Sequence, residues 1–160
     1  MVVEHLDELY REVILDHFTS PRNVGPLPNA QVTAVGQNPL CGDEMTLWLV
    51  VEDDRIRKAH FEGKGCAISQ ATASMLTEQL SGKTLGEVER LIGALKSLMQ
   101  GQAPEAGLDL GDLESLAGVR KFPVRVKCAA LSWNVLEQGL AEFRAKRGIR
   151  KSANGDVSET

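Results

Sequence analysis

The sequence has no long hydrophobic run, and its first residues lack the features of a secretion signal. No apolar stretch approaches the roughly 18–20 residues that a bilayer span requires. The N-terminus is acidic and then amphipathic, whereas a signal peptide has a basic segment followed by an apolar one. These absences predict a cytoplasmic protein that does not enter a membrane.

Cysteine is scarce, and its spacing excludes several common sites. The chain contains only 3 cysteines, an odd number that cannot form a closed set of intramolecular disulfides. None of them forms a CxxC pair, so the sequence supports neither a zinc ribbon nor a thioredoxin-type dithiol. In a reducing compartment, such cysteines are buried, reactive or bound to a metal.

Aromatic residues are also few, at 4%, and this bears on a basic region near the C-terminus. Residues 120–151 contain nine basic and two acidic residues, so this region carries +7 while the rest of the chain carries −11 and the whole −4. No interleaved aromatic residues or groove-reading motif accompany these charges. We therefore expect no nucleic-acid partner, and the region is better explained as a solvated helix face or as a contact for an acidic protein.

The chain is otherwise of ordinary globular composition, and its 160 residues suit one compact domain. Apolar residues recur with helical spacing over residues 6–18, from residue 68 to Ser81-Gly82, and over 85–99. Thr84 and Glu87 fit a capping box at the start of the third of these helices. A short helix is expected over 112–117, and a long one from Pro123 with an inner stripe of Ala129, Trp133, Leu136, Leu140 and Phe143.

Three short strands precede the second helix. A weak strand is expected near 31–35, a strong one over 45–51 with alternating apolar residues, and a third over 55–62 after a turn at Asp53-Asp54. Such short connections imply antiparallel pairing. The predicted fold is α+β, a small three-stranded antiparallel sheet with an N-terminal and a long C-terminal helix packed on it. We expect a single domain over residues 1–147 and a polar, flexible tail over 148–160.

Cys41, Cys66 and Cys128 all lie at the ends of predicted elements, where side chains from distant segments can converge. Each could be a small buried apolar residue, but their glycine and basic neighbours favour a shared metal site. Three thiolates need a fourth ligand to complete a tetrahedral zinc site, and Asp43 is the nearest candidate. Asp43 could instead form a turn with its own backbone.

The histidines His5, His17 and His60 rank below Asp43 as the fourth ligand because none adjoins a cysteine. His17 lies on the apolar face of the first predicted helix and is better explained as a hydrogen-bonded core residue. His5 lies near the N-terminus, and His60 lies in a predicted strand without another ligand beside it.

Five sequence segments together resemble the U-type iron–sulfur assembly proteins, the family of the IscU and NifU scaffolds and the SufU proteins. The segments are Leu-Tyr-Arg-Glu-Val-Ile-Leu-Asp-His-Phe (9–18), Ser-Pro-Arg-Asn-Val-Gly (20–25), Asn-Pro-Leu-Cys-Gly-Asp (38–43), Gly-Lys-Gly-Cys-Ala-Ile-Ser (63–69) and Arg-Val-Lys-Cys-Ala (125–129). They cover roughly residues 5–145 in order. The resemblance implies the α+β fold and a site built from Cys41, Asp43, Cys66 and Cys128.

Two features place the resemblance in the SufU branch. In the IscU branch a histidine precedes the third cysteine, and here that position is Lys127. SufU-like chains also carry an insertion between the second and third cysteines, which the segment near 100–118 resembles. This branch implies zinc held by the four site residues and persulfide sulfur accepted from a PLP-dependent, SufS-like cysteine desulfurase. A downstream iron–sulfur scaffold or acceptor would then receive the sulfur.

Cys41 is our candidate for the catalytic thiol because Pro39 and Gly42 flank it in a loop that moves more easily than a helix start. Arg125 is a candidate to orient Asp43, or an acid of the partner, although it could also be an exposed cation at a helix start. Two alternatives remain open: a scaffold on which a [2Fe–2S] cluster is assembled, and a structural zinc module that only binds a partner.

Overall fold

The computed structural model describes residues 2–40, 42–102 and 107–153. Its elements, in chain order, are α1 (Val2–Thr19), β1 (Val32–Asn38), β2 (Asp43–Glu52), β3 (Arg55–Lys64), α2 (Ala67–Leu80), α3 (Leu85–Met99), the 3-10 helix η1 (Gly111–Gly118) and α4 (Pro123–Ala153). No helix in these ranges combines the length and the apolar character that crossing a membrane demands.

The three strands form one antiparallel sheet in the order β1-β2-β3, which confirms the predicted α+β fold. β1 and β2 are longer than their patterns indicated, because Gln37 pairs with Glu44 and Asn38 with Asp43 at the end of the hairpin. Asp43 therefore opens β2 instead of lying in a loop before it. The predicted turn between β2 and β3 is also confirmed: Asp53 and Asp54 both have positive φ, 54° and 58°, as a type I′ hairpin turn requires.

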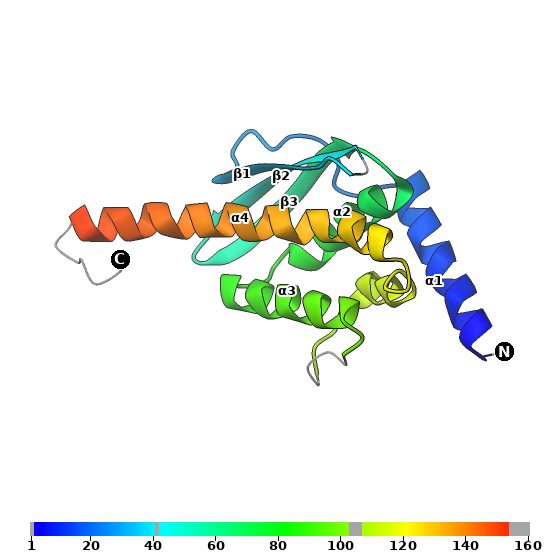
Figure 1. Cartoon of the computed structure of the whole chain (residues 1–160). Helices are drawn as coiled ribbons and strands as arrows, with labels where there is room; N and C mark the ends of the chain where they lie inside the picture. Colours follow the sequence, from blue (N-terminus) through cyan, green and yellow to red (C-terminus); the bar gives the residue numbers. More distant parts are fainter. Residues whose placement is uncertain (1, 41, 103–106, 154–160) are drawn as a thin grey trace.

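One face of the sheet is covered by α2 and α4, and α3 lies on the far side of α4 (Figure 1). The predicted stripe of α4 forms much of this core, since Ala129, Trp133, Leu136 and Leu140 are all at most 3% exposed. Phe143 packs against the same core at its edge. The helical spacing in the sequence was thus sufficient to identify the buried face of α4.

Helix boundaries follow the predicted signals with two differences. The capping box of α3 is present, with the Glu87 N–H donating to Thr84 Oγ1 at 3.1 Å and the Thr84 N–H donating to Glu87 Oε1 at 2.8 Å. The short helix expected over 112–117 is a 3-10 helix, Gly111–Gly118. α4 continues to Ala153, beyond the domain boundary expected at residue 147, and residues 154–160 of the predicted tail lie outside the described residues.

A buried imidazole links the last turn of α1 to α2 and η1. His17 is fully buried, with Nδ1 2.8 Å from Ser74 Oγ of α2 and Nε2 2.8 Å from Asp112 Oδ2 of η1. This confirms His17 as a hydrogen-bonded core residue. Phe18, the last apolar residue of the predicted helix over 6–18, is instead 42% exposed. The last turn of α1 is therefore anchored through a polar contact.

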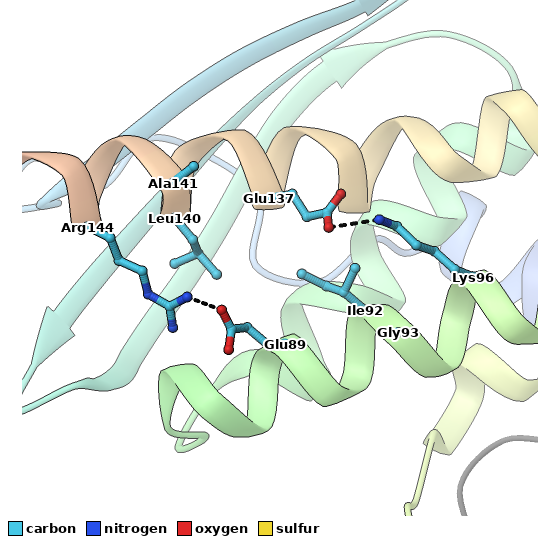
Figure 2. Close-up of a pocket in the computed structure, with 8 residues that line it drawn as sticks. All are labelled: Glu89, Ile92, Gly93, Lys96, Glu137, Leu140, Ala141 and Arg144. Atoms are coloured by element: carbon cyan, nitrogen blue, oxygen red, sulfur yellow. Dashed lines mark hydrogen bonds and ion pairs between the residues drawn. The ribbon is translucent and has the colours of Figure 1, made fainter. Parts of the chain in front are cut away.

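A groove of about 430 Å³ lies between the facing sides of α3 and α4 (Figure 2). Two ion pairs cross it: Lys96 Nζ lies 2.8 Å from Glu137 Oε2, and Arg144 pairs with Glu89. Between them α3 presents Gly93, and a Cβ built at this position would meet no atom within 4 Å. A methyl group therefore fits at Gly93 without displacing a neighbour.

We expect Gly93→Ala to raise the free energy of unfolding by about 0.5–1 kcal/mol, because glycine within a helix costs backbone entropy and the added methyl group is unopposed. Urea unfolding of both proteins measures the change. Gly36→Ala is the matched control: its Cβ would lie 2.4 Å from Val135 Cγ2, so this substitution should destabilise the protein. A lower urea midpoint for Gly93→Ala would contradict the prediction.

Candidate metal centre

Asp43 is the most deeply buried acid of the site, with only 1% of its surface exposed. Its Oδ1 accepts the Cys66 N–H at 2.9 Å, and its Oδ2 lies 4.0 Å from Cys66 Sγ. Burying a carboxylate without partners is costly, and this hydrogen bond recovers part of the lost hydration. One oxygen of Asp43 is thus used to orient the carboxylate, while the other faces a thiol.

Gly65 permits this close approach. Its φ is +153°, and a Cβ at this position would lie 2.1 Å from Asp43 Oδ1 and 2.7 Å from Ser69 Oγ. Real Cβ atoms do not approach oxygen so closely, so any side chain here would displace the carboxylate. The glycine before Cys66 therefore shapes the site directly.

Cys66 is the N-cap residue of α2, with φ −72° and ψ 166°, and its side chain makes no capping hydrogen bond. Its carbonyl accepts the Gln70 N–H, and its half-buried thiol is left facing the site. The sequence prediction that Cys66 sits at a strand-to-helix junction is confirmed.

Cys128 is fully buried in the second turn of α4, with Sγ 3.5 Å from the Val124 carbonyl oxygen. Its Sγ, the Cys66 Sγ and a carboxylate oxygen of Asp43 all lie within 4.8 Å of one another. Ligand atoms sharing one tetrahedral zinc would be about 3.3–3.8 Å apart, given bonds of about 2.0–2.3 Å. Small side-chain adjustments would therefore bring these three atoms to ligand spacing.

Cys41, the third predicted thiol, lies outside the described residues, so its place among the ligands stays a prediction. The residues beside it are described. The Leu40 N–H donates to Asn38 Oδ1 at 3.2 Å, and Gly42 has a φ of +71°, which favours glycine.

Arg125 lies in the first turn of α4 and is exposed, with thiols as its neighbours. The charge of Cys66, followed by a hydrogen bond to Cys128 and the charge of Cys128, raises the pKa of the Arg125 guanidinium. The sequence suggested Asp43, or an acid of the partner, as the group that Arg125 orients, whereas the neighbours recorded for its guanidinium are the two thiols. The proximity of Arg125 to Cys128 could have been predicted from the sequence, because residues three apart in a helix lie on the same face.

His60 does not join this group among the described side chains. His60 Nδ1 lies 3.2 Å from the Gly25 carbonyl oxygen, and the side chain of His5 lies outside the described part. A second group of possible ligands, His17, Glu78 and Asp112, lies between α1, α2 and η1. Both of its acids are exposed, and Arg22 Nε lies 3.8 Å from Glu78, so the group is better explained as a structural ion network.

Comparison with known proteins identifies the family. The family described as "NifU-like N terminal domain" matches residues 9–129. The "Zinc-dependent sulfurtransferase SufU" of Bacillus subtilis is 45% identical over 138 residues, covering 86% of this chain and 93% of that protein. The "Iron-sulfur cluster assembly scaffold protein IscU" of Streptococcus pyogenes is 38% identical over 154 residues, covering 96% of this chain and 91% of that protein.

A solved structure agrees with these matches. The crystal structure of a putative iron–sulfur cluster assembly scaffold protein for the SUF system from Fervidobacterium islandicum superposes with a TM-score of 0.76 at 36% identity, covering 81% of this chain and 94% of that one. The resemblance carried by the five sequence motifs is thereby confirmed. The chain belongs to the family of NifU-like N-terminal domains.

Proposed function

We propose that this protein is a zinc-dependent sulfurtransferase of the cytoplasm that serves iron–sulfur cluster assembly. In this function it accepts persulfide sulfur from a PLP-dependent cysteine desulfurase and delivers it to a downstream scaffold or acceptor. The observation that carries the proposal is the convergence of Asp43, Cys66 and Cys128 from three separate elements. The similarity to a relative named as a zinc-dependent sulfurtransferase supports it.

The described donors suit zinc. Two sulfurs and one carboxylate oxygen are ligands that zinc accepts, and Cys41 would complete a four-ligand set. The buried carboxylate of Asp43 next to a helix N-terminus adds negative charge where a cation would reside. Zinc bound by these residues would keep the thiols deprotonated without adding redox chemistry.

The protein's own residues would then have separate roles in sulfur transfer. The Cys41 thiolate attacks the outer sulfur of the donor's persulfide, the S–S bond of the donor breaks, and the donor cysteine leaves as a thiolate. Cys41 then carries the persulfide, and no electrons are gained or lost overall. Arg125, next to Cys66 and Cys128, would offset negative charge on these sulfurs from the solvent side.

A [2Fe–2S] scaffold is the second candidate function, because relatives named as IscU scaffolds are nearly as similar to this chain. In that case the cluster would be cargo assembled on the same thiols. Lys127 is the feature against it. This residue, beside Cys128 in α4, is exposed and cannot supply the imidazole that the resemblance associates with the IscU branch.

Metal content and desulfurase turnover together test the proposal. We expect the purified protein to be colourless, to carry about one zinc per chain, and to raise the turnover of its cognate desulfurase. Cys41→Ala should abolish this stimulation while the protein stays folded. Iron with acid-labile sulfide and no stimulation would favour the scaffold, and stimulation that survives Cys41→Ala would exclude Cys41 as the acceptor.

A further inference from the structure

Exposed apolar side chains gather where α1 faces the start of α4. Leu15 is 47% exposed, Phe122 58% and Val124 60%. Leu15 and Phe122 line a groove of about 480 Å³, together with Ile14 of α1, Ile68 of α2 and Val119 before α4. We call this hollow the α1–α4 groove. Contiguous exposed apolar surface of this kind marks a binding surface.

The α1–α4 groove adjoins the candidate metal centre. Phe122 and Arg125 line the groove and also a neighbouring hollow of about 550 Å³, whose other lining residues include Cys66 and Leu40. The groove is formed by α1, the start of α2, η1 and the segment leading into α4, and α1 packs against both α2 and η1 at the right of Figure 1. A segment seated in the groove would therefore lie beside the thiols without occupying them.

The charge of the lining identifies the kind of segment that fits. Three cationic side chains, Arg11, Lys121 and Arg125, line the groove, and none of its described lining residues is a carboxylate. This is opposite in sign to the protein as a whole, whose net charge is −4. Complementary potentials favour an acidic partner with an apolar anchor. A symmetric contact between two copies of this chain through the groove would place the two cationic linings against each other, which charge disfavours.

We propose that the α1–α4 groove is the docking site for the sulfur donor, which inserts a large apolar side chain from an acidic segment of its surface. This inference rests on the proposed function and adds a contact separate from the reacting thiols. The groove sets how tightly the donor binds, and the candidate metal centre performs the transfer. Substitutions of the groove residues on α1, such as Leu15 and Arg11, should therefore change affinity and leave the metal content unaltered.

Leu15→Glu tests the inference because its side chain is exposed and its replacement spares the core. With the cognate desulfurase, we expect the dissociation constant and the concentration for half-maximal stimulation to rise about tenfold or more. Zinc content and turnover at saturation should match those of the unaltered protein. Val35→Glu is the matched control: Val35 is 56% exposed on the opposite face of the sheet and should have no effect.

Arg11→Glu provides an independent test of the docking site. It should weaken binding and flatten its dependence on ionic strength, since one attractive charge is replaced by a repulsive one. Equal binding by Leu15→Glu and the unaltered protein, or equal weakening by Leu15→Glu and Val35→Glu, would overturn the docking site. Loss of self-association in Leu15→Glu with desulfurase binding intact would instead assign the groove to a second copy and overturn the proposal.

The two proposals can fail separately. If the unaltered protein binds the desulfurase without stimulating it, the proposed function is wrong, and the affinities of the variants still decide the docking site. If it stimulates the desulfurase and the groove variants bind equally well, only the docking site is wrong. Absence of binding by the unaltered protein would overturn both.

Discussion

Gly65→Ala is expected to lower the affinity for zinc by about 10–100-fold or more, although Gly65 itself offers no ligand. The new methyl group would lie 2.1 Å from Asp43 Oδ1, so the carboxylate must turn away and give up the Cys66 N–H. The site would lose a positioned oxygen as well as the backbone geometry that presents Cys66. Competition with a chromophoric chelator measures the affinity.

Gly82→Ala separates this effect from backbone strain. Gly82 also has a positive φ, +88°, but a Cβ there would meet no atom within 4 Å. We expect this control to lose stability and keep its zinc affinity. If Gly65→Ala bound zinc as tightly as Gly82→Ala, the prediction that Gly65 positions Asp43 as a zinc ligand would be wrong.

Trp133→Ala should remove about 3–5 kcal/mol from the free energy of unfolding. Trp133 is the largest of the fully buried side chains and lies at the centre of the α4 stripe, where its loss leaves a cavity that the rigid sheet cannot close. Domains of this size are stable by only about 5–15 kcal/mol, so the variant would approach the limit of folding.

Urea unfolding followed by circular dichroism measures this loss. Phe122→Ala is the aromatic control, because Phe122 is 58% exposed and its removal should change the free energy of unfolding by about 0.5 kcal/mol or less. A loss below about 1.5 kcal/mol for Trp133→Ala would contradict the view that α4 supplies the main wall of the core.

Much of the fold could be predicted from the sequence because its helices carry strong periodic patterns. The stripe of α4, the capping box at Thr84 and the Asp53-Asp54 turn each depend on neighbours within a few residues. The extent of β1 could not be predicted in this way. It depends on pairing with β2, where Asn38 meets Asp43, and such pairing is decided by the whole hairpin.

The candidate site, like the fold, could be predicted only where it depends on local sequence. Local signals were enough to place Cys66 at a helix start and Cys128 within the long helix. The hydrogen bond between Asp43 and the Cys66 N–H spans 23 residues and depends on the register of β2 with β3. The partners of His17 were beyond prediction for the same reason, since Asp112 lies 95 residues away in the sequence.

If the proposed zinc site is correct, the hydrogen bond that orients Asp43 bears on how the metal would be exchanged. In zinc fingers the ligands are scattered in an unfolded chain, so metal uptake and folding are one event. Here the apolar core of β2, α2 and α4 orders the described donors, and Asp43 is aimed by the backbone itself. A chelator should therefore leave a folded apoprotein, and reloading should proceed as simple ligand exchange on a preorganised frame, with little of the binding energy used to order the chain.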